Sequence, residues 1–561
     1  MKLFSLTYNE LVKQFKKPSI KLLSILILVA AIIFPIAIDS IPENRYYKST
    51  MESNKFLLQD AELYLESLKD DKTQKGKIKF EYAMINVEAR KLYVENEVGH
   101  RDWREKEIEN YRNVSSNLAA IEFVLEGYEK DIVLENLQND DSNEVEKYFN
   151  MTLAKKKEIE SNFIAEKEKI KNIILNNDYI AHTQEEINRT NSQVAQLNSC
   201  ISEYEKLMKK NPTDEAGKSK LLELEKKSKD AKIRIPQLQQ DMEVMKFRFD
   251  NKIDYDLNNW KNNSIQQIEN ELIELRNPML DEKQYSSQAS LEGVEMTYDE
   301  YVKNFNKKRE VTINQIKELW YGLENNIPVL NQIKDARSVL DGGYEIFVVL
   351  AVIMVIIIGG GIVATEYSKG TIRLLLIRPV SRWKILLSKL LAVLIVGIGV
   401  VFIGIATLYI STGVVFGFET YKTPLLDTIS GSIVHLSYIK FLLSKIMISC
   451  SSLVFIATLV FLISTVAKNT ALAVAISMML YLGAVPATDM LISLKQTWII
   501  STFIPYINVS YLRLIPSTQQ MLSQSFGMQL EYTQGAIQLI LISIVMLLIT
   551  FITFIRRDVK N

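Results

Sequence analysis

The chain has 561 residues, of which 48% are hydrophobic and 24% charged, and its 66 basic and 66 acidic residues cancel. This zero net charge excludes a function that depends on bulk electrostatic attraction to nucleic acid. Charged residues concentrate between about residue 40 and residue 340, whereas apolar residues concentrate after residue 344 and in one early block. The averages therefore describe a membrane protein with a large polar insertion.

The chain begins with a basic amphipathic segment and a first apolar run. Residues 1–19 carry apolar side chains at helical spacing among lysines, which predicts a cytoplasmic interfacial helix or, alternatively, a disordered basic tail. The apolar positions are Leu3, Phe4, Leu11 and Phe15. Residues 20–38 are long enough to cross a bilayer and lack a small-x-small cleavage site, so we expect an uncleaved first transmembrane helix.

The polar region at residues 39–343 is predicted to be helical. Glycine is sparse there, while Lys, Glu, Gln, Asn and Leu dominate. Heptad-like spacing predicts a coiled-coil hairpin with its tip near 211–217, and Pro236 should kink or interrupt its second helix. Further helices are expected at 50–96, 103–136, 145–175 and 253–276. Such a domain is either a spacer or a contact surface for a protein or peptide partner, and Cys200 within it is either a free thiol or cross-linked between chains.

Five more apolar runs lie in residues 344–555 and bring the predicted number of membrane spans to six. The runs are 344–364, 385–411, 441–466, 471–491 and 534–555. Lys and Arg cluster before the first span, between the second and third, between the fourth and fifth, and after the sixth. The positive-inside rule makes that side the cytoplasm. We therefore expect a multi-pass protein of the cell membrane with cytoplasmic termini, a cytoplasmic tail at 556–561, and residues 39–343 outside the cell.

Two lysines do not follow this rule. Lys440 and Lys445 lie at the outer end of the fourth span, where few lysines are expected. Lys445 either snorkels outward or faces a cavity between spans, where it would attract anionic cargo.

The link at residues 359–391 is the most informative stretch of the sequence. Three consecutive glycines, Gly359 to Gly361, permit close helix approach or local flexing near the inner face. Leucines and isoleucines then alternate with basic residues until Pro379, which suits a turn that docks into a groove on a soluble partner. The alternative is an ordinary basic loop shaped only by topology.

The order of residues in this link resembles the type-2 family of ATP-binding-cassette (ABC) exporter permeases, in the branch with a large extracellular insertion between the first two spans. The resemblance also covers the N-terminal helix, the six spans, the turn at Lys468–Asn469 and an outer re-entrant segment at 493–532, and it hardly reaches the outer domain. It implies that loop 364–386 is the coupling loop that contacts the ATPase. The matching residues are Glu366, Tyr367, Gly370, Thr371, Arg373, Leu374, Leu375, Pro379, Ser381, Arg382 and Lys389.

The family further implies ATPase subunits and a second permease copy as partners, besides the lipid bilayer. No G-x-x-x-x-G-K-[ST] loop occurs, so we expect no ATP site, catalytic site or cofactor in this chain, with ATP-Mg held by the partner ATPase. The scattered histidines lack metal-ligand spacing. The predicted function is outward transport of an amphipathic peptide, antibiotic or lipid. Alternatives are a surface scaffold of phage-receptor or secretion type, or a peptide-antibiotic resistance or sensing module.

Overall fold

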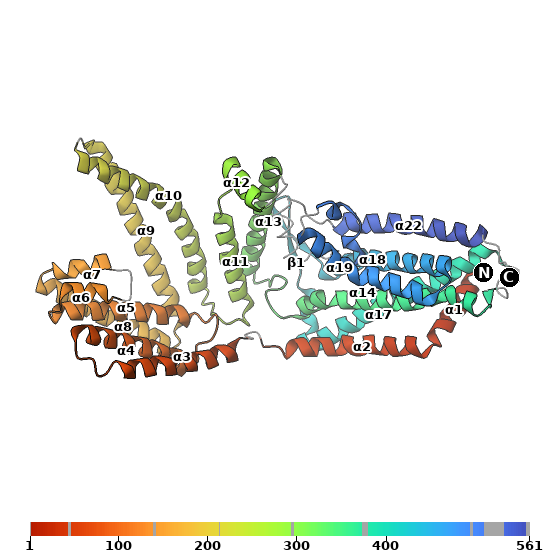
Figure 1. The fold of residues 1–561 in the computed structure, drawn as a ribbon, viewed down its shortest axis with the longest axis horizontal. Coiled ribbons are helices and arrows are strands. Elements are labelled where there is room, and N and C mark those ends of the chain that lie inside the picture. Colours follow the sequence, from red (N-terminus) through yellow and green to blue (C-terminus); the bar gives the residue numbers. More distant parts are fainter. Residues whose placement is uncertain are drawn as a thin grey trace. The chain divides into compact units, whose positions relative to one another are not determined.

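The computed structural model describes residues 2–42, 46–137, 142–212, 214–292, 297–372, 380–493, 497–509 and 532–556. The chain divides into two compact units (Figure 1). The first contains residues 1–41 and 270–561, and the second contains residues 42–269.

Six helices of the first unit are long and apolar enough to cross a bilayer, counted over the part of the chain that the structure describes. The prediction of an all-α membrane protein is confirmed. Most of the apolar part of α14 is buried against α17, α18 and α19, whereas the same part of α2 is mostly exposed and so available to lipid. These helices are α2 (Pro18–Asp39), α14 (Ala336–Ile362) with its continuation α15 (Ala364–Ser368), α17 (Arg382–Phe416), α18 (Tyr438–Ala467), α19 (Thr470–Ser493) and α22 (Tyr532–Arg556).

The central helix α14 begins earlier than its apolar run. The backbone N–H of Ser338 donates to Asp335 Oδ1 at 2.8 Å, so Asp335 caps the helix and Ala336 is its first residue. Hydropathy places the start at residue 344 because it detects the apolar stretch and not the cap. Polar residues of the first two turns, including Arg337 and Asp341, therefore belong to the same helix as the membrane span.

Two of the three glycines near the end of α14 allow close helix packing, one of the two roles predicted for them. A Cβ atom at Gly359 would lie 2.5 Å from Val460 of α18, and one at Gly360 would lie 2.5 Å from Val474 of α19. Both distances are far below van der Waals contact. The Ser464 hydroxyl donates to the carbonyl oxygen of Gly360 at 2.9 Å, which fixes α18 against α14 at this level.

Gly360→Val is therefore expected to destabilise the bundle by about 1–3 kcal/mol through overpacking. A lower thermal unfolding midpoint of the purified protein would show this. Gly399→Val in α17 is the matched control, because no atom lies within 4 Å of a Cβ there. Equal midpoints for the two variants would contradict the close approach of α14 and α19.

A two-stranded antiparallel hairpin between α17 and α18 was not predicted. It consists of β1 (Leu425–Ile429) and β2 (Ser432–Leu436), preceded by the 3-10 helix η1 (Phe418–Lys422). Ser430 and Gly431 form its turn with φ of 52° and 81°, the left-handed pair that a two-residue type I′ hairpin requires. A Ser-Gly pair flanked by Leu, Ile and Val was the available signal.

The remaining elements of the first unit are not membrane spans. They are α1 (Lys2–Phe15), α12 (Glu282–Glu292), α13 (Tyr298–Glu324), η2 (Thr497–Ser501) and η3 (Pro505–Ile507). The hairpin packs on α13, where Thr428 Oγ1 donates to Glu318 Oε1 at 2.9 Å. The predicted re-entrant segment 493–532 lies outside the described residues apart from its two end residues and 497–509, and of the predicted tail only Arg556 is described.

The second unit is helical and includes the predicted hairpin. Helix α9 packs along α10, and Asn211 between them adopts a left-handed conformation with φ of 45°. Helix α10 continues through Pro236, so the interruption considered there does not occur. The predicted helix 50–96 is two helices, because Thr73 caps a new one. The predicted helices 103–136 and 145–175 are also divided in two, and Thr152 caps the second part of the latter. The elements are α3 (Tyr47–Ser67), α4 (Gln74–Glu95), α5 (Arg104–Leu125), α6 (Lys130–Glu135), α7 (Ser142–Phe149), α8 (Leu153–Leu175), α9 (Tyr179–Lys210), α10 (Glu215–Asp250) and the start of α11 (Trp260–Arg276).

Candidate functional site

Helix α1 presents its polar face to the bundle and its aromatic face outward. Thr7 and Gln14 are buried, whereas Phe4, Tyr8 and Phe15 are exposed. The exposed residues recur at helical spacing, so they form one apolar stripe. This arrangement suits a helix that lies in the membrane interface with its ring-bearing face in lipid.

The polar face of α1 reaches Glu366 in α15. The Glu366 carboxylate is buried and accepts hydrogen bonds from the Lys13 ammonium and from the Thr371 hydroxyl. Lys389 Nζ of α17 lies 3.5 Å from the same carboxylate. One acidic side chain therefore joins α1, α15 and α17.

Lys389 completes this network. Its side chain is only 3% exposed, and its Nζ lies 2.9 Å from Glu10 Oε1 on α1. The two negative carboxylates and the two positive ammonium groups therefore have no net charge. Buried charged groups are stable only when they are paired in this way. Although burial lowers the pKa of Lys13, Glu366 and Glu10 raise it above the ordinary lysine value. We call Glu10, Lys13, Glu366 and Lys389 the ion-pair network.

Resemblance identified Glu366 and Lys389 in advance, but not Glu10 and Lys13. The only signal for the latter pair was an acidic residue set among the lysines of the interfacial segment. Thr371, also predicted, joins them through its hydroxyl.

Two further predicted residues connect the link to the rest of this end of the bundle. The ring of Tyr367 lies 4.9 Å from Lys468 Nζ, at the turn between α18 and α19. Arg382 Nη1 donates to the carbonyl oxygen of Ile555 near the end of α22 at 3.3 Å. In Figure 1 helix α1 and the end of α22 lie at this end of the bundle.

Gly370 and Ser381 shape the backbone of the link. Gly370 has a φ of 69°, a left-handed conformation that side chains disfavour, so it allows the chain to turn after α15. Ser381 stands at the N-cap position of α17. The predicted site residues Arg373, Leu374, Leu375 and Pro379 lie outside the described part of the chain.

Comparison with known proteins gives the family. Residues 114–559 match the family described as ABC-2 family transporter protein. The chain belongs to this family. It is the membrane-spanning permease subunit of an ABC transporter, a class whose ATP hydrolysis takes place in a separate ATPase partner.

The matched range begins within α5, so it takes in much of the helical region that the resemblance hardly reached. An uncharacterized protein of Bacillus subtilis (strain 168), YhcI, is 31% identical to the permease over 266 residues, which cover 45% of this chain and 77% of the relative. No solved structure matches the permease.

At the other end of the bundle, Lys445 has a partner within the permease. Its Nζ lies 2.7 Å from Asp341 Oδ1, and it also lies over the rings of Tyr344 and Phe441. Asp341 is nearly buried. The ion pair explains how a lysine is accommodated at this position. A role of Lys445 in the cargo path stays a prediction.

In the second unit, three side chains are close enough together to bind a metal ion. The ligand atoms of Glu107, His182 and Glu186 all lie within 4.8 Å of one another, an arrangement that the spacing of the histidines did not predict. Arg189 Nη1, however, lies 3.1 Å from Glu107 and 2.7 Å from Glu186, and Lys106 also pairs with Glu186. A divalent cation would have to displace these cations, so we interpret the group as an ion-pair cluster.

This cluster predicts a dependence on acid pH. Burial alone would raise the pKa of Glu107, but hydrogen bonds from His182 and Arg189 and the charge of Arg189 lower it to about 2. A depressed pKa contributes stability that is complete above the unfolded value, about 4.3, and is lost as the pH falls towards about 2. We expect the second unit to lose about 3 kcal/mol over that window.

Arg189→Met should move this acid transition to higher pH, because it removes a charge that keeps Glu107 ionised. The fluorescence of Trp103, whose ring lies 4.6 Å from that of His182, reports on the cluster. The control is Arg112→Met, which breaks an exposed i,i+3 pair with Glu109. Identical acid transitions for both variants would show that Arg189 does not set this pKa.

Proposed function

We propose that the permease belongs to a bacterial exporter that moves an amphipathic cargo outward, with ATP-Mg bound by separate ATPase subunits and two permease copies forming the path. The observation that supports this most strongly is the ion-pair network. It attaches the segment around Glu366, where the family resemblance implies ATPase contact, to α1 and α17.

The proposed coupling mechanism follows from these attachments. Closure of the ATPase subunits on ATP would push on loop 364–386. Because Glu366 is joined to Lys13 and Lys389, the push would move α1 and the start of α17 together. Helix α17 packs along α14, so the movement would reach the centre of the bundle. The basic residues at this end, among them Lys13 and Lys468, support its assignment to the cytoplasm and residues 39–343 to the outside.

Reconstitution tests the direction of transport. The permease, co-expressed with its partner ATPase, is placed in vesicles with the ATPase-binding side outward. ATP should then drive a fluorescent amphipathic peptide into the lumen, and Arg373→Ala should reduce both uptake and hydrolysis. Lys422→Ala, an exposed site in η1, is the matched control. Uptake that does not depend on ATP, or full hydrolysis without the permease, would overturn the proposal.

The same vesicles test Lys445 as part of the cargo path. If the Lys445–Asp341 pair opens to admit an anionic group of the cargo, Lys445→Ala changes transport without lowering expression. The nearby exposed Lys440→Ala serves as the control. Unchanged transport in both variants would remove Lys445 from the path.

A further inference from the structure

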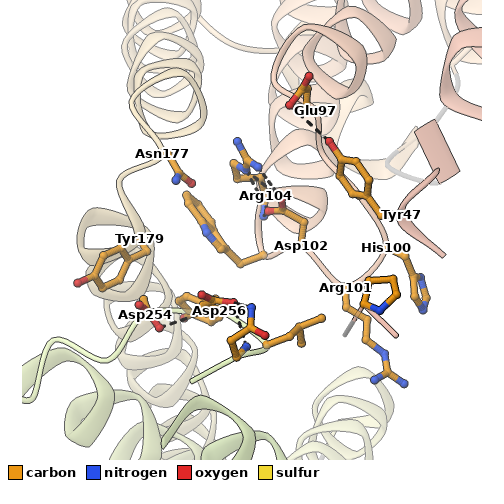
Figure 2. A pocket seen from close by; sticks show the side chains of 16 residues that line it. Tyr47, Glu97, His100, Arg101, Asp102, Arg104, Asn177, Tyr179, Asp254 and Asp256 are labelled. Carbon is orange, nitrogen blue, oxygen red and sulfur yellow. Dashed lines mark hydrogen bonds and ion pairs between the residues drawn. The ribbon is translucent and has the colours of Figure 1, made fainter. Parts of the chain in front are cut away.

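The second unit contains a cavity of about 740 Å³ that the transport mechanism does not use (Figure 2). Its wall comes from the start of α3, the turn between α4 and α5, the turn between α8 and α9, and the connection from α10 to α11. A volume of this size matches that of small-molecule sites in proteins.

The floor of the cavity is a packed aromatic layer. Trp103 and Tyr255 both line the cavity and contact each other at 6.1 Å, and the ring of His182 packs against both, at 4.6 Å from Trp103 and 5.4 Å from Tyr255. The Arg248 guanidinium lies 3.9 Å from the Tyr255 ring and donates to the carbonyl oxygen of Asp254 at 2.7 Å. These contacts hold the connection from α10 to α11 in place, so the site is formed before any ligand arrives.

The charges on the wall are predominantly negative. Four carboxylates and two guanidinium groups line the cavity, an excess of two negative charges. They are Glu97, Asp102, Asp254 and Asp256 against Arg101 and Arg104. Arg104 is already engaged, since its Nη2 lies 2.6 Å from Asp102 Oδ2.

The carboxylates of Asp254 and Asp256 bind neutral donors, although the charge of the buried Arg248 guanidinium also acts on Asp254. Asp254 accepts from the side chain of Asn259 at 2.7 Å, and Asp256 accepts from the backbone N–H of Asn258 at 2.9 Å. These donors are neutral, and within the described chain neither carboxylate forms an ion pair. Figure 2 shows Asp254 next to Tyr179, with Asp256 further along the same side of the cavity.

We propose that this cavity binds an amphipathic cation. An ammonium or guanidinium group is held by Asp254 and Asp256, and an attached apolar or aromatic group lies against Tyr47, Trp103 and Tyr179. Carboxylates attract the cation directly, and aromatic faces add a further attraction. This site goes beyond the transport function and does not depend on it.

Calorimetric titration of the full-length permease in nanodiscs of zwitterionic lipid tests the site, with empty nanodiscs subtracted. The probe is the dipeptide amide Lys-Phe-NH₂, and its anionic counterpart is N-acetyl-Phe-Glu. We expect the first to bind and the second not to. Asp254→Asn with Asp256→Asn keeps the side-chain shapes and should weaken binding about tenfold or more. Asp254→Asn alone is a milder variant should the double one not fold.

The control removes two charges elsewhere in the same unit, through Glu205→Gln with Asp230→Asn on the exposed surface of the α9–α10 hairpin, and should bind as the parent does. Equal binding of both dipeptides, or unchanged affinity in the aspartate variants, overturns the proposal. A calcium titration that gives the only specific signal, lost in the double variant, also overturns it by assigning the aspartates to a divalent cation. ATP-driven transport is not measured here, so either proposal can fail without the other.

Discussion

Glu366→Gln is expected to abolish most of the ATP hydrolysis that depends on the permease. The substitution keeps the shape of the side chain but leaves the ammonium groups of Lys13 and Lys389 with one carboxylate, Glu10, in place of two. Breaking a buried ion pair from one side costs about 3–5 kcal/mol. The segment around Glu366, for which we propose ATPase contact, should then detach from α1 and α17, and hydrolysis by the complex should fall tenfold or more.

A double-mutant cycle tests whether Glu366 and Lys389 act through their mutual contact or independently of each other. Lys389→Met should impair hydrolysis as Glu366→Gln does, and the double variant should lose less than the two single losses combined. Glu419→Gln breaks the exposed pair with Lys422 and should be nearly silent. Additive losses, or normal hydrolysis in Glu366→Gln, would show that the segment is held by other contacts.

Arg337→Met should destabilise the opposite end of the bundle by about 3–5 kcal/mol. Arg337 is fully buried, and it lies 2.8 Å from Asp335. It also donates to the carbonyl oxygens of Pro328, Thr423 and Pro424 at 3.0, 3.3 and 3.4 Å. Removing it leaves a buried carboxylate and several acceptors without their donor.

The thermal unfolding midpoint of the purified permease measures this loss. Arg337→Lys should fall between the parent and Arg337→Met, because it keeps the charge but loses the planar fork that reaches several acceptors. Lys422→Met, at an exposed position in η1, should melt as the parent does. A midpoint for Arg337→Met equal to that of Lys422→Met would show that these contacts do not hold the loops together.

The membrane spans were predictable because a bilayer demands about 20 apolar residues and little else. The partners of Glu366 and Lys389 were not, since Lys13 lies 353 residues from Glu366 and Glu10 lies 379 residues from Lys389. No periodicity in the sequence brings such distant residues together. The resemblance drew attention to the loop that contains Glu366, but it carried no information on the residues that pair with Glu366.

Local chemistry explains the other differences. Capping side chains such as Thr73 and Asp335 set helix boundaries that composition does not reveal. The strands β1 and β2 have only five residues each. A search for apolar runs of more than 20 residues does not detect segments of this length. The metal-like grouping around His182 depends on α5 and α9 meeting, which again is tertiary information.

The β-hairpin gives α13 a second point of attachment to the membrane helices. Along the chain, residues 325–335 connect α13 to α14. The hairpin makes the second attachment, since Thr428 binds Glu318 of α13 and His435 binds Tyr321 of α13. The hairpin is itself the connection between α17 and α18. Because α13 is attached both to α14 and to the hairpin, a rotation of α17 relative to α14 would also rotate α13.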